Sequence, residues 1–391
     1  EMTSSLVGSE MCIRDSDNDL QPRSRESLDV QTHASLERNA GSINDFANSI
    51  RAMRRHEIER IGLGWMSGVI DDKASLAGMT DVYDTAIDAS LTWAIRHQTQ
   101  EMGLDEAPAA IAVIGMGRYG GREVNFSSDA DVIIIYRPSD NADDNQANLF
   151  ARKVQEDLRA ILQGPTTLEP KIELDMDLRP EGKNGPLVRS YASCEEYYRS
   201  WASTWEHQAL LRARYAAGDA ALAEDFLMNV ADPLRYPKID LTEAQVAEIR
   251  KLKARMEAER LPRGVRRDRH LKLGKGGLSD VEWTIQLLQL QHAGDNANLR
   301  VNGTMQALDE LERRKLVSAG DAVVLRRAWW MCTAARNGSY LWSGRVNQAD
   351  ILPDDTYSLG GLAVYLGYDA NRGQHFENDL LAVMRKARDV T

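Results

Sequence analysis

The spacing of hydrophobic residues divides the chain into a helical part, a part with strands and a second helical part. Apolar side chains recur three and four positions apart over residues 43–61, beginning with Ile43 and Phe46, and again over residues 80–97. This spacing puts the apolar side chains on one face of an amphipathic helix. We therefore predict helices between about residues 42 and 100.

Three strands are predicted in the next part of the chain. Residues 109–114 and 132–136 are short, uninterrupted apolar runs, and residues 171–180 alternate apolar and polar side chains. A helix is predicted over residues 146–163, between the second and third strands. In the third strand the alternation assigns Ile172, Leu174, Met176 and Leu178 to one face, and Glu173, Asp175, Asp177 and Arg179 to the other.

The rest of the sequence predicts a disordered N-terminal segment and a long C-terminal helical region. Residues 1–40 are polar and lack an apolar period, so we expect them to be disordered, and the string up to residue 16 resembles a translated sequencing adaptor. After residue 186 all predicted elements are helices, over 194–217, 242–260, 279–293, 304–315, 320–342 and 374–390. The fold class is α+β, with a disordered or artefactual tail over 1–40, a helical arm over 41–104, a module with a mixed sheet over 105–190 and a helical bundle over 191–391.

Composition and charge narrow the function. The 391 residues are 43% hydrophobic and 27% charged, which is ordinary for a globular protein. The net charge of −11 argues against a nucleic-acid partner, because such proteins neutralise phosphates with massed Lys and Arg. No apolar run reaches the ~20 residues that span a bilayer, and no signal peptide is recognisable, so no membrane partner is expected. The three cysteines, Cys12, Cys194 and Cys332, are too far apart for a zinc pair, and we predict a cytoplasmic protein.

A glycine-rich turn followed by two aspartates is the main chemical signal. Gly115-x-Gly117-x-x-Gly120 follows a predicted strand and matches a dinucleotide-binding fingerprint. That fingerprint requires an acid at the end of the next strand, whereas Asp129 and Asp131 stand at its start. The lysine of a Walker loop is also missing. An oxidoreductase on a dinucleotide-binding fold therefore remains only a weaker alternative.

Four acidic side chains are candidates for a metal site. Asp129 and Asp131 project to the same side of an extended chain, with Cα atoms ~7 Å apart, and can bracket two metal ions ~3.5–4 Å apart. Asp175 and Asp177 join them if the third strand pairs beside the second. Converging carboxylates repel by ~4 kcal/mol per close pair at an effective dielectric constant of ~20, which favours a bound cation such as Mg²⁺. Alone, an Asp-x-Asp sequence is also common where a strand begins.

Two basic loops are candidates for phosphate contacts. Arg179 and Lys183 lie in a glycine-hinged loop directly after the acidic strand, although an ordinary strand-exit turn has the same composition. Lys272 and Lys275 lie in a glycine loop before a predicted helix start, where backbone N–H groups bind anions.

An aromatic stripe and two arginines share the predicted helix over residues 194–217. We expect the stripe to be part of the core rather than a platform for a base. The arginines continue the helix and are weaker candidates for a phosphate contact. The residues concerned are Tyr198, Trp201, Trp205 and Gln208, followed by Arg212 and Arg214.

These motifs, in this order, resemble the glutamine synthetase adenylyltransferase family, and more narrowly the C-terminal half of its actinobacterial form. The resemblance covers most of residues 42–390. It rests on the segments GMGRYGGREVNFSSDADVIIIY, DMDLRPEGKNGPLVRS, YYRSWASTWEHQALLRAR, ERLPRG and HLKLGKGGLSDVEWTIQLLQLQHA. It implies a polymerase-beta-like nucleotidyltransferase domain over residues 105–190. Members carry two such modules, of which the C-terminal one adenylylates a tyrosine of glutamine synthetase and the N-terminal one removes AMP by phosphorolysis. Only one module is recognisable here, so we expect a fragment.

The resemblance also implies roles for individual residues. Asp129 and Asp131 match the metal-binding Asp-x-Asp, and Asp175 matches the third carboxylate, with Asp177 as the alternative. The metals are expected to be two Mg²⁺ ions, and ATP is expected to be a substrate. The expected ATP contacts are Gly120 and Gly121, in the turn that holds the triphosphate, together with Arg122, Ser128, Arg179, Lys183, Lys272 and Lys275.

The expected reaction is attack of a tyrosine hydroxyl of glutamine synthetase on the α-phosphate of ATP, with release of pyrophosphate. It would regulate nitrogen assimilation, and a PII-type signal protein is a further expected partner. Two alternatives within the family stay open: phosphorolytic removal of AMP by the same fold, and a regulatory fragment without catalytic activity.

Overall fold

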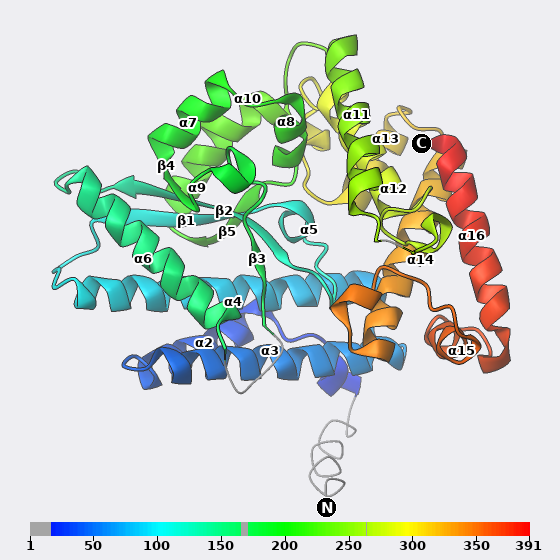
Figure 1. Ribbon diagram of the computed structural model, residues 1–391, viewed down its shortest axis with the longest axis horizontal. Coiled ribbons are helices and arrows are strands. Elements are labelled where there is room, and N and C mark those ends of the chain that lie inside the picture. The colour runs from blue at the N-terminus through cyan, green and yellow to red at the C-terminus, as the bar shows by residue number, and fades with distance from the viewer. Residues whose placement is uncertain (1–16, 166–170, 263) are drawn as a thin grey trace, which may run out of the picture. The chain divides into compact units, whose positions relative to one another are not determined.

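The chain divides into two units, each built mainly from helices. The computed structural model describes residues 17–165, 171–262 and 264–391 (Figure 1). The first unit comprises the described parts of Glu1–Val124, Asp129–Tyr198 and Arg214–Phe226. The second comprises the described parts of Asn125–Ser128, Arg199–Ala213 and Leu227–Thr391. The expected α+β class with a small mixed sheet is confirmed, and the sheet belongs to the first unit.

The sheet combines antiparallel and parallel pairs. Its strands are β1 (Ala109–Gly115), β2 (Ala130–Pro138), β3 (Leu174–Asp175), β4 (Val188–Ser190) and β5 (Arg214–Gly218). The order is β3-β2-β1-β5, and β4 also pairs with β2. β1 runs antiparallel to β2 and β5, whereas β3 and β4 run parallel to β2. β1 and β2 read as continuous apolar runs because residues 111–115 and 132–136 are all buried.

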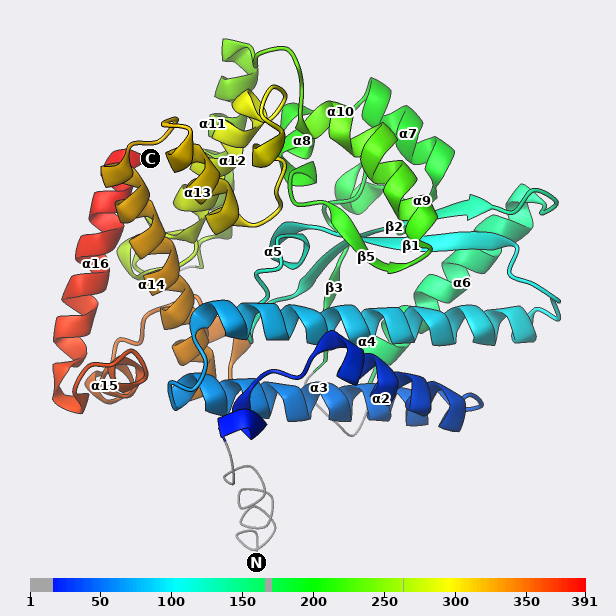
Figure 2. The same ribbon diagram turned by 180° about the vertical axis from the view of Figure 1, so that it is seen from behind.

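Long helices accompany the sheet in the first unit. They are α2 (Arg25–Arg38), α3 (Ile43–Met66), α4 (Asp72–Glu101) and α6 (Asp144–Gln163). α4 packs against α2, α3 and α6, and Figures 1 and 2 show α3 and α4 running side by side along one side of the sheet. The predicted arm is therefore part of the same compact unit as the sheet. This unit also contains α7 (Tyr191–Ser200) up to Tyr198, and α9 (Ala220–Phe226).

Helix α2 lies in the segment for which disorder is predicted, so that prediction is wrong for residues 25–38. Ser24 caps the helix by accepting a hydrogen bond from Ser27 N, and Leu28 and Leu36 are buried. The two other buried positions are Thr32 and Ser35, so the buried face shows little apolar periodicity in the sequence. Residues 1–16, with the adaptor-like string and Cys12, lie outside the described residues.

The predicted helix over residues 194–217 is also wrong in part. The chain forms α7, then α8 (Thr204–Leu210), and then strand β5. Ser203 and Glu206 make a capping box that starts α8. The break also interrupts the aromatic stripe, because Tyr198 is buried whereas Trp201 is 74% exposed. β4 is a second strand in the region where only helices are predicted.

The second unit is a helical bundle around α14. Its longer helices are α8, α11 (Glu243–Arg260), α12 (Leu278–His292), α13 (Thr304–Arg313), α14 (Ala319–Ser343), α15 (Thr356–Tyr365) and α16 (Gly373–Val390). α14 packs against α12, α13, α15 and α16, which explains why so many of its side chains are buried. Five of these helices lie within two residues of their predicted bounds, whereas α15 is not predicted. None of the described helices is both long and apolar enough to cross a membrane.

The two described cysteines are expected to resist thiol reagents. Cys194 on α7 and Cys332 on α14 are fully buried, and burial raises the pKa of the Cys194 thiol to about 12. At pH 8 only about 10⁻⁴ of that thiol is thiolate, which is the reactive form. A Cys12→Ser variant should therefore leave an aromatic disulfide reagent unreduced when native and react at two thiols after unfolding. Labelling of either cysteine in the native protein within minutes would contradict this prediction.

Candidate functional site

The pairing of β2 with β3 brings two of the predicted metal-binding carboxylates together. The strands are parallel, with Ala130 opposite Leu174 and Asp131 opposite Asp175. Ala130 N donates to Glu173 O at 2.8 Å. Neighbouring strands lie ~4.8 Å apart, and residues in register project to the same face of the sheet. Asp131 and Asp175 are therefore neighbours, on strands that are far apart in the sequence.

Strand β3 is much shorter than predicted, because Asp175 ends it. Asp177 N donates to the Asp175 carboxylate at 2.7 Å, which closes a turn directly after the strand. Ile172, Leu174 and Met176 are buried, in line with the predicted alternation. The alternation fails at position 179, where the side chain predicted to share the polar face is buried.

An open cleft of about 370 Å³ lies beside this edge of the sheet. Asp129, which is exposed, lines it together with Asp175 and Asp177. Its other lining residues include Arg159, Glu173, Arg179 and Lys183. Asp129, just before β2, and the acids at the end of β3 thus line one cleft, whereas Asp131 is not among its lining residues. The size of the cleft is in the range of small-molecule sites.

Gly117 is the glycine that meets the candidate carboxylates. It begins the short helix α5 (Gly117–Gly120) with a φ of +52°, and a Cβ atom at this position would overlap the Asp131 carboxylate. The residue before it, Met116, donates its N–H to Asp131 O at 2.8 Å. Only glycine combines this backbone conformation with such a close approach. The need for glycine at this position could have been found from the sequence, because Gly117 is the second glycine of the Gly115-x-Gly117-x-x-Gly120 pattern.

The two glycines predicted to cradle the triphosphate have their N–H groups engaged. Gly120 N donates to Met116 O at 2.6 Å, and Gly121 N donates to Gly117 O at 3.0 Å. Both bonds close the turn itself. The structure therefore assigns Gly120 and Gly121 to the frame of the turn, and their contact with phosphate stays a prediction.

Arg122 and Ser128 also make contacts within the protein. Arg122 has a φ of +57° and forms ion pairs with Asp81 at 2.6 Å and Asp84 at 3.3 Å, both on α4. Ser128 donates to Asn125 Oδ1 at 2.8 Å and accepts from Asn125 N at 3.1 Å. These bonds close the turn that leads into the Asp-x-Asp segment. A direct role of either side chain in ATP binding stays a prediction.

In the loop after β3, Arg179 and Lys183 differ in exposure. Arg179 is buried and donates to the carbonyl oxygens of Met176, Gly185 and Pro186 at 2.7–3.1 Å, so it holds the loop together. The side chain of Lys183 is 82% exposed and forms an ion pair with Asp177 at 3.3 Å. Lys183 is therefore the cation of this loop that a phosphate in the cleft can reach.

The glycine loop that contains Lys272 and Lys275 belongs to the second unit and closes on itself. Gly274 N donates to His270 O at 2.7 Å, and Gly276 N donates to the Asp280 carboxylate at 2.6 Å. Asp280 is buried. Although burial opposes this, Lys253 and the Gly276 N–H hold the pKa of Asp280 below its usual value. An internal carboxylate thus takes the position predicted for an external anion, and phosphate contacts by Lys272 and Lys275 stay predictions.

The two arginines predicted to continue the aromatic helix are held inside their own units. In the second unit, Arg212 is buried and donates to Asn302 O at 2.8 Å. In the first unit, Arg214 forms an ion pair with Asp84 at 2.7 Å and donates to Tyr119 O. The interaction of Arg214 with Asp84 and the glycine turn is not predicted from the sequence, because a single acid in a helix carries no such signal.

The donor set fits Mg²⁺ better than a softer metal. Within the described ranges, no three His, Cys, Asp or Glu side chains converge closely enough to form a complete metal site. Asp131 and Asp175 are in register, and Asp129 lines the cleft together with Asp175. Mg²⁺ commonly takes one or two carboxylates and completes its shell with water and substrate phosphates. A nucleotide could therefore complete the site that these carboxylates begin.

Two family models match the chain. One, described as glutamate-ammonia ligase adenylyltransferase, matches residues 10–229. The other, described as GlnD PII-uridylyltransferase, matches residues 247–391. The first match includes all the candidate carboxylates and the glycine turn, and the second lies within the helical bundle.

Individual relatives carry the name bifunctional glutamine synthetase adenylyltransferase/adenylyl-removing enzyme. The chain is 79% identical to that of Bifidobacterium longum (strain DJO10A), over 96% of this chain and 35% of the relative. It is 44% identical to that of Mycobacterium tuberculosis (strain ATCC 25618 / H37Rv) and 42% identical to that of Mycobacterium avium (strain 104), in both cases over 87% of this chain and 34% of the relative. The chain thus spans about a third of the length of these curated relatives.

Proposed function

Because the chain belongs to the glutamate-ammonia ligase adenylyltransferase family, we propose that it transfers AMP from ATP to a tyrosine of glutamine synthetase. The observation that carries the proposal is the register of Asp131 with Asp175, beside a cleft that Asp129 also lines. The nucleotidyltransferase assignment replaces the dinucleotide-binding alternative, for which nothing in the family match gives support. The sheet and its acids are also consistent with the polymerase-beta-like module that the resemblance implies.

Three carboxylates would hold the metal. Asp129, Asp131 and Asp175 supply oxygen donors, and Asp175 is oriented by the N–H of Asp177. Two Mg²⁺ ions bound there would neutralise the charge that develops on the phosphates during transfer. We assign the third position to Asp175 rather than Asp177, because Asp175 is opposite Asp131 whereas Asp177 forms an ion pair with Lys183.

Residues of this chain would deprotonate the acceptor tyrosine and contact the phosphates of ATP. The tyrosine oxygen attacks the α-phosphorus of ATP, the bond from that phosphorus to the oxygen of the leaving pyrophosphate breaks, and the hydroxyl proton passes to a carboxylate oxygen of Asp175. Lys183, exposed at the cleft, would contact the phosphates. The neighbouring Arg179 keeps the loop in place through three backbone carbonyls.

The direction of the reaction is testable, because the relatives' name includes both addition and removal of AMP. We expect the chain, with Mg²⁺ and ATP labelled at the α-phosphate, to put label on unmodified glutamine synthetase. With adenylylated glutamine synthetase and phosphate, we expect ADP to form at least tenfold more slowly. Faster ADP formation would favour phosphorolysis, and no label in either assay would favour a regulatory fragment without catalytic activity.

A second proposed partner of the chain would bind the helical bundle. We propose that a PII-type signal protein binds residues 247–391, because these residues match the model described as GlnD PII-uridylyltransferase. Binding of this partner would connect AMP transfer to nitrogen supply, as the resemblance implies.

A further inference from the structure

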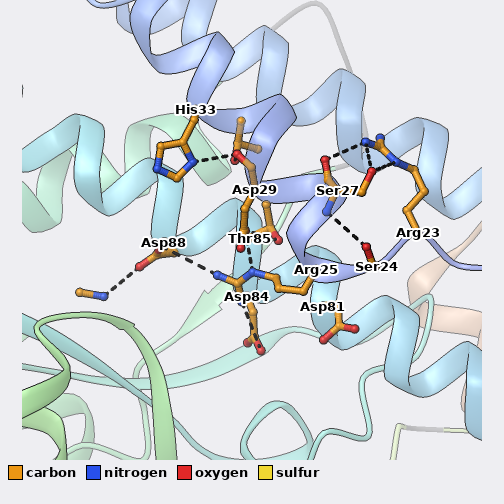
Figure 3. A network of polar contacts seen from close by, with 12 residues as sticks. Arg23, Ser24, Arg25, Ser27, Asp29, His33, Asp81, Asp84, Thr85 and Asp88 are labelled. Atoms are coloured by element: carbon orange, nitrogen blue, oxygen red, sulfur yellow. Dashed lines mark hydrogen bonds and ion pairs between the residues drawn. The ribbon is translucent and has the colours of Figure 1, made fainter.

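Asp84 on helix α4 is the buried centre of a polar network in the first unit. Its side chain is 5% exposed and forms ion pairs with Arg214 at 2.7 Å, Arg122 at 3.3 Å and Arg25 at 3.7 Å. Figure 3 shows Arg25 reaching from α2 towards Asp84 and Asp88 on α4. A buried carboxylate with several arginine partners is costly to disturb, because removal of its charge leaves those cations without compensation.

Two of the three arginines hold the glycine turn. Arg122 is the residue after Gly121 and keeps its left-handed backbone while its side chain reaches α4. Arg214 donates from Nε and Nη2 to Tyr119 O at 3.3 and 3.1 Å, and its guanidinium lies 4.8 Å from the centre of the Tyr119 ring. Asp84 thus fixes the second half of the turn from two sides.

The first half of the same turn lies against Asp131. Gly117 has no room for a side chain beside the Asp131 carboxylate, and Met116 N is bonded to Asp131 O. Gly120 and Gly121 then link back to Met116 and Gly117 through their own N–H groups. A shift of the turn would therefore change the space in which the Asp131 carboxylate lies.

We propose that Asp84 is a positioning residue for AMP transfer: through Arg122 and Arg214 it fixes the glycine turn against Asp131. Asp84 does not line the candidate cleft, so its influence on the reaction passes through the turn. This inference rests on the proposed function for its catalytic consequence. Its structural part, the control of the turn by Asp84, stands without it.

Asp84→Asn tests the proposal, because asparagine keeps the shape of the side chain and removes its charge. We expect hydrogen exchange in the segment 116–122 to become at least tenfold faster, since the Gly120 and Gly121 amides are bonded within the turn. We also expect affinity for Mn²⁺ in the presence of ATP, measured by electron paramagnetic resonance, and kcat for AMP transfer each to fall ~10–100-fold, as for residues that orient metal ligands.

Asp157→Asn is the matched control. Asp157 is on α6, and its carboxylate is 2.7 Å from His97 Nδ1 and accepts from Gln98 Nε2 at 2.6 Å, so it joins α6 to α4 without contacting the turn. Both variants are expected to lower Tm, but only Asp84→Asn should change exchange in the turn and Mn²⁺ affinity. If Asp84→Asn does not fold, Arg122→Ala is the second variant, because the Arg122 side chain is 47% exposed and its loss removes one of the ion pairs of Asp84. Arg122 is itself a predicted ATP contact, so hydrogen exchange of the turn is the measurement for this variant, and it should become faster to a smaller degree than in Asp84→Asn.

The outcomes separate this proposal from the proposed function. Unchanged exchange and Mn²⁺ affinity in Asp84→Asn, or equal changes in Asp157→Asn, would overturn the role of Asp84. A wild-type chain that transfers no AMP would overturn the proposed function, whereas faster exchange of the turn in Asp84→Asn alone would still support its control by Asp84.

Discussion

Asp131→Asn is expected to slow AMP transfer to glutamine synthetase by ~10²-fold or more, because loss of a metal donor weakens the stabilisation of charge in the transition state, while it leaves the protein as stable as the wild type. Asp131 stands opposite Asp175 on the neighbouring strand, so the substitution removes one of the proposed metal donors. It also removes a like-charge pair, and such pairs directly opposite each other destabilise a sheet by ~0.2–1 kcal/mol. Activity should therefore collapse without a loss of Tm, which transfer of labelled AMP and calorimetry without Mg²⁺ would measure together.

Two companion variants sharpen this test. Asp140→Asn changes an exposed acid in the same unit that does not line the cleft, and its activity should stay within twofold of the wild type. The fold-loss in the rate of AMP transfer should be less than a tenth as large in Asp177→Asn as in Asp175→Asn, because only Asp175 is in register with Asp131. Wild-type rates in Asp131→Asn, or equal effects at positions 175 and 177, would contradict the assignment of the carboxylates.

Gly117→Ala is expected to slow AMP transfer about as much as Asp131→Asn does, but for a steric reason. A methyl group at this position would overlap the Asp131 carboxylate, and the backbone has a φ of +52°. The left-handed conformation alone costs a non-glycine residue ~1–2 kcal/mol. The overlap adds a displacement of Asp131 or of the turn, so we expect a loss of ~10²-fold or more in the rate of transfer.

Gly103→Ala separates the cost of the left-handed backbone from the cost of the overlap with Asp131. Gly103 has a φ of +64° in the same unit, and a Cβ atom there would meet nothing within 4 Å. The backbone conformation should cost each variant ~1–2 kcal/mol in the free energy of unfolding, and the overlap should add to this loss in Gly117→Ala only. Gly103→Ala should transfer AMP at a rate within twofold of the wild type. If the two variants lose activity equally, the contact between Gly117 and Asp131 is not important for transfer.

The parts of the fold that depend on local pattern could be predicted from the sequence. β1 and β2 are short, uninterrupted apolar runs, and α11 and α14 have regular apolar spacing. The bounds of all four elements lie within two residues of the predictions. The pairing of Asp131 with Asp175 was predictable as a possibility, because both lie on extended segments rich in acids. Its register is a property of the sheet and is not encoded locally.

The parts that depend on distant partners could not be predicted. β5 is a strand only because β1 offers it an edge, and its sequence continues that of an aromatic helix. Arg179 and Arg214 look like phosphate ligands in the sequence, yet backbone carbonyls and Asp84 engage them. An arginine that binds phosphate and one that ties a loop together have the same sequence signature, because the guanidinium donates equally well to either acceptor.

The interleaved path of the chain affects how the first unit can be produced separately. A linear domain map would end it near residue 190, yet β5 comes later, and its pairing with β1 includes the bond from Asp219 N to Ile111 O at 2.8 Å. A recombinant piece that stops at residue 190 would leave a bare, apolar edge on β1, and such edges promote aggregation. A usable minimal enzyme would have to extend at least through Phe226 and so carry the intervening residues of the bundle with it.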